Sequence, residues 1–586
     1  MSLQVARNIA YSSLMTTQLQ LGVTSANIAN ASTAGYTTKT AEQSASITAG
    51  VGSGVTVSGI SSAVDKLLMK SLVGATSALG AANTTQSYAD QLQSLLGSTT
   101  GGTNNAGTSL ANSLASLETA LSQLSQTPES TTLKAQAVEA FDAVASQLRS
   151  MSSGIQTLRG NADSGIASAV STVNDNLATI DSLNRQIATA KARGDGTADL
   201  EDQRNTALQA VATQMNVSYY VNNDNQMRVY TGSGEPLVDS SLHKLSYSTA
   251  AAVTAGTTYS TGSSSGLSAI TLDGTDITAK ITSGAIGSLI GQRDDTLPAA
   301  QDQLDTLAAG LIAGLNGVHN AGTALPAPAT LTGSASVSAG TSFTGAGTLR
   351  VAVTDSNGDT VSYQDLDLTA YSTVGDLVGA LDGVSGVSAA LDADGRLVVS
   401  SDDASDGVAI AGTGTLDGTG VSSYFGLNDL FTGSSASDIR VRADILATPS
   451  ALAAGSLDTT STVVAGDTAI ASGSSAISDA LVAALSGNTS FAASGNLGAS
   501  STSFAGYATD IIGLVATAST RADTQQTTQQ TAQSALATSM SSQTGVNIDE
   551  ETARLTDLQN AYSTASEVMK AVNDMFTTLL DVVKAS

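Results

Sequence analysis

Apolar side chains recur every three or four residues from Phe141 to Ile187, and this long pattern constrains the fold more than any other feature of the sequence. Such spacing places one row of side chains along a single face of a helix. At 1.5 Å of rise per residue, the row predicts a helix on the order of 70 Å long or more. The row consists of Phe141, Val144, Leu148, Met151, Ile155, Leu158, Ala162, Ile166, Ala169, Val173, Leu177, Ile180 and Ile187. A helix of that length is a strut, so we expect a rod-shaped molecule.

The C-terminal residues carry the most regular pattern in the chain. Counting by seven gives one row of Ile548, Leu555, Tyr562, Met569, Phe576 and Val583, and a second row of Leu558, Ala565, Val572 and Leu579. Only Glu551 interrupts the second row. This arrangement predicts a coiled-coil seam from residue 548 to residue 583.

The N-terminal segment also predicts a helix with one apolar face. That face consists of Leu3, Ala6, Ala10, Leu14, Leu21 and Ile28, and we expect the helix to end near Ala34 and Gly35. Its other positions are mostly Ser, Thr, Gln and Asn, whose helix propensity is mediocre, so the isolated helix is marginal in water. We therefore expect the two chain ends to pair, and to become fully ordered only when neighbouring subunits add further burial.

Between the ends, helical and strand-like patterns alternate. A strand pair or extended loop is expected at 47–59, and a helix with its apolar row from Ile60 to Leu92. A hairpin is expected at 217–221 and 227–230. The predicted fold class is α+β and multi-domain, with long helices from both chain ends and β-rich domains inserted in the middle. The expected divisions are a terminal coiled-coil domain at 1–46 and 545–586, a helical-bundle domain at 47–325 and 446–544 with a β portion at about 217–283, and a distal β-rich domain at 326–445.

Composition excludes several classes of function. The chain has 50 acidic and 23 basic residues, and its formal net charge is −27, which opposes binding to nucleic acid or to anionic lipid surfaces. It has no Cys, so disulfides, thiolate metal sites and Cys nucleophiles are excluded. No segment has the sustained apolar character of a membrane span or of a secretory signal peptide. We expect an exported protein to leave the cell without a cleaved signal.

The sequence nominates no catalytic, cofactor-binding or metal-binding residue. Gly262 to Gly266 spells G-x-S-x-G, but within a Ser/Gly tract that lacks the strand-turn-helix setting of a nucleophile elbow. The Asp-rich turns at 355–359 and 392–395 do not match calcium-loop spacing. The two histidines, His243 and His319, are interpreted as solvated residues near segment ends.

Both chain ends contain motifs that resemble a known group of proteins. The segment from Asn27 to Tyr36 reads NIANASTAGY and resembles the N-terminal signature of flagellar rod, hook and hook-associated proteins. Three C-terminal segments, 547–551, 558–562 and 575–580, resemble the closing helix of the same group. The interior is more specific: 127–130, 173–187, 199–205, 232–238 and 284–298 look like flagellar hook-associated protein 1, the FlgK family. The resemblance covers about residues 1–322 and 500–586.

This resemblance implies a non-enzymatic structural protein at the junction between flagellar hook and filament. It implies a homo-oligomeric ring in a helical lattice, with hook protein on one side and a second junction protein on the other. It also implies type III export to the flagellum outside the cell, assisted by a chaperone that holds the C-terminal helix. Neither nucleic acid nor a membrane is an expected partner, and no cofactor is expected.

The residues expected to carry assembly lie on the two terminal helices and on the N-terminal signature. They are Leu3, Leu14, Leu21, Asn27, Ile28, Asn30, Gly35, Tyr36, Ile548, Leu555, Leu558, Gln559, Tyr562, Met569, Val572, Phe576 and Leu579. The main alternative is an acidic surface-layer or adhesin-like subunit, which suits the Ser/Thr-rich middle but not the paired end motifs. A secreted hydrolase is a second alternative, and hook protein or the second junction protein are alternatives of the same class.

Overall fold

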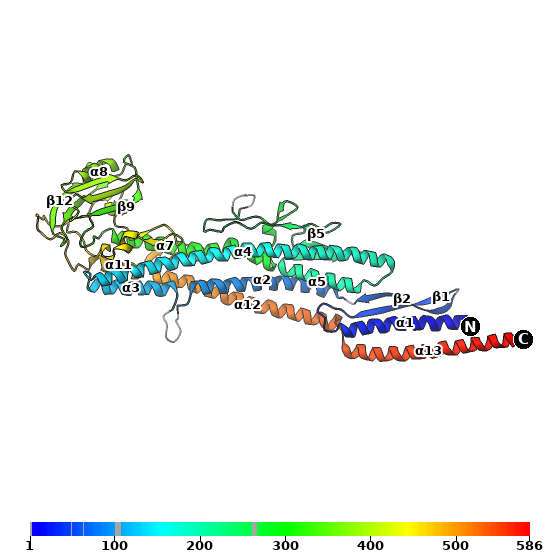
Figure 1. Cartoon of the computed structure of the whole chain (residues 1–586). Coiled ribbons are helices and arrows are strands. Elements are labelled where there is room, and N and C mark those ends of the chain that lie inside the picture. Colours follow the sequence, from blue (N-terminus) through cyan, green and yellow to red (C-terminus); the bar gives the residue numbers. More distant parts are fainter. Residues whose placement is uncertain (1–2, 49, 63, 100–106, 261–265, 586) are drawn as a thin grey trace.

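A computed structural model describes residues 3–48, 50–62, 64–99, 107–260 and 266–585. The molecule is elongated, with both termini at one end and a β-rich region at the other (Figure 1). Between them lies a bundle of long helices. The predicted fold class is confirmed: long helices lead in from both chain ends, and small sheets occupy the middle of the sequence. In the described part of the chain, no helix is long and apolar enough to cross a membrane.

The bundle is organised around one very long helix, α4. It spans Thr131–Arg193, 63 residues, which corresponds to about 95 Å. Its N-cap Ser130 accepts a hydrogen bond from the Leu133 amide, and Gly194 ends it in the left-handed conformation at φ +78°. Every member of the apolar row from Phe141 to Ile187 is buried, as the sequence predicts.

The other bundle helices pack along this strut. They are α2 (Lys66–Leu96), α3 (Leu110–Gln126), α5 (Ala198–Gln214), α6 (Gly284–Gly291), α7 (Leu297–His319), α11 (Ala476–Ser486) and α12 (Phe504–Thr544). A π-helical turn, η2 (Gln292–Thr296), joins α6 and α7 into one helical run. The apolar residues of these helices share a single core with those of α4. The long axis of the molecule is therefore the axis of the bundle.

A small β region packs against the side of the bundle, where its apolar residues join the bundle core and buried Arg293 adds polar contacts. Its strands are β3 (Val217–Val221), β4 (Met227–Thr231), β5 (Pro236–Val238), β6 (Leu245–Ser246), β7 (Thr271–Leu272) and β8 (Thr275–Asp276), with the turn η1 (Thr278–Lys280). The strands β3 and β4 form the predicted hairpin. On the π turn, fully buried Arg293 contacts Asp163 of α4 and the Tyr247 hydroxyl. Burial and the neighbouring Asp163 carboxylate raise the pKa of Tyr247.

The distal region has its own core beneath short antiparallel sheets. Its central strands are β9 (Thr330–Ser336), β11 (Thr348–Thr354), β12 (Thr360–Asp367), β13 (Val387–Leu391), β14 (Arg396–Ser401) and β15 (Gly407–Gly412), covered by α8 (Val374–Asp382). Smaller elements of this region are the strands β10 (Gly345–Ala346), β16 (Thr415–Leu416) and β17 (Thr419–Gly420) and the helical turns η3 (Leu368–Ala370) and α9 (Val421–Phe425). Other small elements lie beside the bundle helices instead: the hairpins β18 (Phe431–Thr432) with β19 (Arg440–Val441) and β20 (Thr489–Phe491) with β21 (Ser500–Thr502), and the turns α10 (Ala443–Ala447) and η4 (Pro449–Ala451).

The division between bundle and distal region does not follow sequence order. Phe431, Ile439 and Val441, which the sequence places in the distal domain, belong to the bundle core. Leu457 and Ile470, which lie beyond the expected boundary, pack beside distal residues instead. The chain thus passes between the two cores more often than a single insertion at 326–445 implies, because apolar segments join whichever core lies nearest in space.

At the terminal end, three local expectations need correction. The first helix, α1 (Leu3–Ala29), ends before Gly35, and a turn follows it. The expected strand pair is longer than 47–59 and consists of β1 (Lys39–Thr48) and β2 (Val51–Ser62). Ile60 therefore lies in β2, and α2 starts only at Lys66, because Asp65 caps it by accepting bonds from the Leu67 and Leu68 amides.

His319 is not solvated, contrary to the sequence interpretation. It lies at the end of α7 and is 1% exposed. Its Nδ1 lies 2.5 Å from the Asn428 carbonyl oxygen, and its Nε2 accepts a bond from the Ala453 amide at 2.9 Å. These contacts suit the neutral ring, with the proton on Nδ1. Burial lowers the pKa of His319 to about 4.

We expect His319 to make the bundle less stable in mild acid. The unfolded chain binds a proton near pH 6.5, whereas the folded chain does so only near pH 4. The free energy of unfolding is therefore unaffected by this residue above pH 6.5. As the pH falls from 6.5 towards 4, protonation of His319 in the unfolded chain lowers the free energy of unfolding by about 3 kcal/mol in total. Denaturant unfolding at several pH values checks this. In the His319→Gln variant, the free energy of unfolding should not show this decrease between pH 6.5 and 4. If the free energy of unfolding fell in parallel for the variant and the parent chain, the buried neutral state of His319 would be contradicted.

Candidate functional site

The terminal helix α1 lies between two neighbours. On one side it packs antiparallel to α13 (Ile548–Ala585), and on the other it is covered by the β1–β2 hairpin (Figure 1). The Arg7 guanidinium lies 5.6 Å from the centre of the Phe576 ring on α13. The Ser12 hydroxyl oxygen accepts a bond from the Val55 amide of β2 at 3.2 Å. Pairing of the chain ends, which the sequence predicts, is present in the single chain.

The heptad seam of α13 faces α1, but burial along it is incomplete. Ala565 and Val572 are buried. Half-buried seam residues are Leu555, Leu558, Met569 and Phe576 on α13, and Leu3, Leu14, Leu21 and Ile28 on α1. The remaining predicted assembly residues of α13 are exposed: Ile548, Gln559, Tyr562 and Leu579. A two-helix pair of this kind leaves much apolar surface in water.

Asn27 is the polar centre of the terminal pair and is fully buried. Its Nδ2 donates to the Lys39 carbonyl oxygen at 2.9 Å and to Glu551 Oε2 at 3.1 Å. Its Oδ1 accepts from the Lys39 amide and from the Tyr36 hydroxyl, both at 3.0 Å. All four hydrogen-bonding positions of the amide are thus occupied. This bond explains why Glu551 interrupts the heptad seam: its buried carboxylate accepts a hydrogen bond from Asn27.

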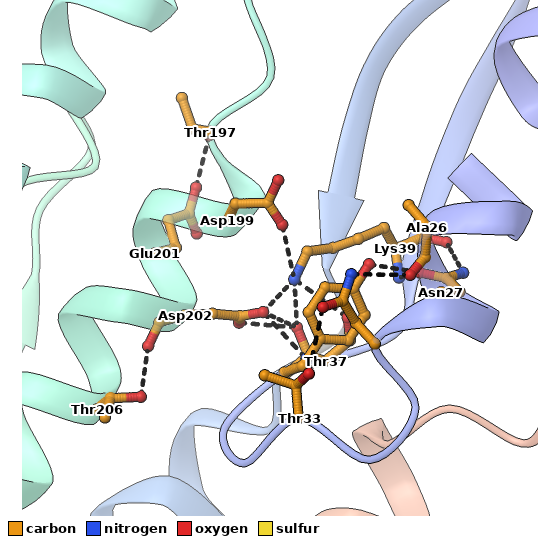
Figure 2. Close-up of polar contacts among 12 residues, drawn as sticks. Ala26, Asn27, Thr33, Thr37, Lys39, Thr197, Asp199, Glu201, Asp202 and Thr206 are labelled. Atoms are coloured by element: carbon orange, nitrogen blue, oxygen red, sulfur yellow. Dashed lines mark hydrogen bonds and ion pairs between the residues drawn. The ribbon is translucent and has the colours of Figure 1, made fainter. Parts of the chain in front are cut away.

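Lys39 forms a second polar centre, between the hairpin and the bundle (Figure 2). Its ammonium group is buried and pairs with Asp202 of α5. It also donates to the Thr37 carbonyl oxygen at 3.1 Å and lies 4.2 Å from the centre of the Tyr36 ring. Asp202 in turn accepts bonds from the Thr37 amide at 3.0 Å and the Thr37 hydroxyl at 2.8 Å. A buried charge is tolerated only with such pairing.

The neighbouring residue Thr38 ties the same loop to the end of α12. Its amide donates to the Thr544 carbonyl oxygen, and its hydroxyl donates to the Gly545 carbonyl oxygen, both at 2.7 Å. Residues 36–39 therefore bond to α1, to α5 and to the turn between α12 and α13. We call this loop, together with Asn27, Asp202 and Glu551, the polar anchor. It fixes the terminal pair to the bundle.

The other residues of the N-terminal signature shape the anchor. Gly35 has φ +79°, and a Cβ there would lie 2.7 Å from the Thr206 hydroxyl, so the position favours glycine. Asn30 acts locally, since its Nδ2 donates to the Ala26 carbonyl oxygen at the end of α1. Burial, aided by the nearby Asp199, Asp202 and Glu551 carboxylates, raises the pKa of Tyr36 to about 12. Tyr36 therefore stays a hydrogen-bond donor at neutral pH.

Sequence reasoning missed Thr37, Lys39 and Asp202 as parts of the site. One signal was present: residues 8–38 contain no charged residue, and Lys39 ends that run. A lone charge after so long a neutral segment is a candidate for a specific partner. The partner itself, 163 positions further along the chain, could not be read from the pattern.

No other cluster in the described residues offers a better site. His243 is half-buried rather than solvated, with its Nδ1 2.6 Å from Asp273 and its Nε2 3.3 Å from both Asp239 and Ser241. Hydrogen bonding to Asp273 raises the pKa of His243, which favours the protonated ring rather than a base for Ser241. Within the described ranges, no group of three acidic or His side chains is arranged to hold a metal. Positions 262–265 of the G-x-S-x-G match lie outside the described residues.

Comparisons with known proteins find matches to three families of flagellar proteins. Residues 89–334 match the family model of the flagellar hook-associated protein FlgK helical domain. Residues 8–37, on α1 and the loop that leads to the anchor, match the flagella basal body rod protein family. Residues 537–582, on the end of α12 and on α13, match the C-terminal family of the flagellar basal body rod FlgEFG proteins. The chain belongs to the FlgK family.

A solved structure of the flagellar hook junction protein FlgK from Burkholderia pseudomallei has a similar fold. It is 17% identical, the alignment covers 80% of this chain and 99% of that one, and the TM-score is 0.50. No curated protein sequence matches the chain. As a FlgK-family member, the chain has a structural, hook-associated role in the flagellum and thus serves motility.

We expect Lys39→Met to loosen the terminal pair from the bundle. Removal of one partner of a buried ion pair costs roughly 3–5 kcal/mol, because the Asp202 carboxylate then stays buried without its cation. Hydrogen exchange at the amides of 3–48 should accelerate by about a hundredfold or more, which is what a loss of about 3 kcal/mol produces. Lys280→Met removes the more exposed ion pair with Glu235 and serves as the control. Equal exchange in both variants would contradict the anchor.

The Asn27–Glu551 contact generates a separate prediction for α13. Glu551→Leu removes an acceptor from a buried amide and should cost about 1–2 kcal/mol, whereas Glu551→Gln keeps an acceptor and should cost less. Hydrogen exchange along 548–576 measures both. If Glu551→Leu protected α13 better than the parent chain, the carboxylate would be a defect in the seam rather than a partner of Asn27.

Proposed function

We propose that this chain is the structural subunit that joins the flagellar hook to the filament, and that it assembles through its terminal helices. Family membership supports a hook-associated structural role. The fold similarity to a hook junction protein supports the more specific position. In this proposal, copies form a ring in a helical lattice, with hook protein on one side and a second junction protein on the other.

The observation that carries the proposal is the apolar surface left exposed on α1 and α13. Tyr11 is 59% exposed, Met15 52% and Leu19 41%, and on α13 Val568, Met575, Leu579 and Val582 are between 47% and 63% exposed. Isolated apolar residues on a surface are ordinary, but rows of them on two adjacent helices indicate an interaction surface. The terminal pair is thus suited to binding further helices.

The distribution of charge supports the same use of the chain ends. Each copy carries a formal charge of −27, so close packing of many copies is opposed by repulsion. On α1 and the turn that follows it, residues 8–38 carry no charge at all, and α1 itself carries only Arg7. If copies of the chain contact one another through residues 8–38, the acidic residues of the bundle and of the distal region can stay apart.

The polar anchor supports a mechanical role. It joins the loop at 36–39 to three helices through buried hydrogen bonds and an ion pair. In a lattice, force applied to the terminal pair passes through this loop to α5 and α12, and from there to the long bundle. A flexible linker at the same place would not transmit it.

The proposal includes export through the flagellar type III apparatus, with a chaperone that holds the C-terminal helix. A chain without Cys cannot form a disulfide that would block passage in an unfolded state. The exposed apolar residues of α13 are the part of the chain that a chaperone would need to cover before assembly.

The test is assembly in a strain that lacks the native gene. Leu558→Asp or Met569→Asp places a carboxylate in the half-buried seam, so each should leave the protein soluble and exported but abolish its incorporation and the attached filaments. Ser563→Asp, on an exposed face of α13, is the control and should incorporate normally. Electron microscopy of purified flagella reads out the result. Normal filaments from both seam variants would refute assembly through the terminal helices.

A further inference from the structure

Three basic side chains gather at the C-terminal end of α4. Lys191 and Arg193 lie in its last turn, and Arg185 lies about two turns earlier. All three are exposed, and we call them the basic corner. Two carboxylates, those of Asp181 and Asp195, lie beside them. The basic corner is thus a local excess of positive charge on a chain whose formal net charge is −27.

The basic corner borders an open depression of about 390 Å³ between the end of α4 and the start of α5. Arg185 and Arg193 are exposed members of its lining, whereas Ala190 and Leu200 are half-buried. Arg185 pairs with Asp181 at 3.0 Å, and within the described ranges Arg193 forms no ion pair. The depression therefore combines a basic edge with an apolar floor.

The first turn of α13 carries the opposite charge beside an exposed apolar side chain. Asp549 and Glu550 are exposed, and the neighbouring Ile548 is 51% exposed. We call these three residues the acidic turn. Among the described residues neither Asp549 nor Glu550 forms an ion pair, and the nearby Arg554 contacts Glu551 instead. Acidic residues at a helix start and basic residues at a helix end each suit their own helix dipole, so the single chain keeps both patches exposed.

The polar anchor holds the basic corner and the acidic turn at the same level along the molecule. Thr37 and Lys39 bond to Asp202 of α5, which follows α4 after a short turn. Thr38 bonds to the turn between α12 and α13, directly before the acidic turn. Figure 1 shows the end of α4 and the start of α13 on opposite sides of the molecule at this level. A neighbour placed alongside in the same orientation therefore brings its acidic turn level with the basic corner.

We infer that the depression at the basic corner receives the acidic turn of a second copy of this chain, placed beside the first. The inference rests on the proposed function and specifies a side-to-side contact. Asp549 and Glu550 face the basic corner in this contact, and Ile548 covers the half-buried floor. Each acidic copy thus gains a point of attraction to its neighbour. Because the two patches differ and lie on opposite sides, the contact is heterologous and continues from copy to copy, as a ring requires.

The absence of Cys from the chain allows a test by cross-linking between copies. A strain without the native gene carries two alleles, Arg193→Cys and Glu550→Cys, so that a disulfide between the two positions can only join different copies. Flagella are purified, oxidised and run on a non-reducing gel. We expect a dimer from the mixed strain and none from either allele alone. Arg193→Cys with Asn560→Cys is the matched control, since exposed Asn560 lies about 15 Å further along α13, beyond the reach of a disulfide.

The outcomes separate this inference from the proposed function. Flagella that contain both variants but no dimer would overturn the inference and leave the function intact. Dimers of equal yield from a single allele, or from the Asn560→Cys control, would also overturn it. If the unsubstituted chain were absent from purified flagella, the proposed function itself would fail.

Charge reversal gives a second, independent measurement. Arg193→Glu and Glu550→Arg each place like charges across the contact, so each alone should lower the proportion of cells with filaments by about tenfold or more. Both changes in one chain restore opposite charges between copies and should recover the filaments. Arg440→Glu makes the same charge change at an exposed residue of β19, away from the contact, and should keep them. A double variant no better than either single one would overturn the pairing of these two patches.

Discussion

The arrangement of the terminal region depends on the burial of one ammonium group, that of Lys39. A cation removed from water must regain its stabilisation from neighbours, and here three residues from two parts of the chain supply it. Asp202 supplies the opposite charge, the Thr37 carbonyl supplies an acceptor, and the Tyr36 ring supplies a π face. Because Asp202 lies on α5, the requirement to pair this charge fixes the hairpin, and with it α1, against the bundle.

A long rod has little interior per residue, so specific polar contacts matter more at its ends than at its centre. Along α4 the apolar row is buried throughout, and packing alone positions the surrounding helices. At the terminal pair only two α13 residues of the heptad rows, Ala565 and Val572, are buried. There the register of α1 against α13 rests on the Asn27–Glu551 bond, in the way that one polar residue sets the register of a coiled coil.

Polarity is divided along the molecule in a way that suits assembly. The acidic turns of the distal region, such as those at Asp355 and Asp392, use their carboxylates to accept backbone amides. The neutral segment at 8–38 lies at the opposite end (Figure 1). The charged residues at that end lie mainly on α13, for example Glu567 and Asp574, whereas α1 presents an almost uncharged surface. In the proposed assembly, contacts made through α1 therefore add little repulsion between acidic copies.

The sequence by itself determined the long strut, the heptad seam, the pairing of the chain ends and the family, because periodic burial and short motifs are local properties of the chain. The sequence also identified Asn27 and Tyr36 as candidate assembly residues and Glu551 as the residue that interrupts the heptad row. Only the tertiary structure decided that Asn27 binds Glu551, that Lys39 pairs with Asp202, that His319 is buried and that Phe431 joins the bundle core. These contacts join residues more than a hundred positions apart or, for His319, depend on three separate segments. No local pattern records such partners, because the free energy that selects them arises only when distant segments exclude water together.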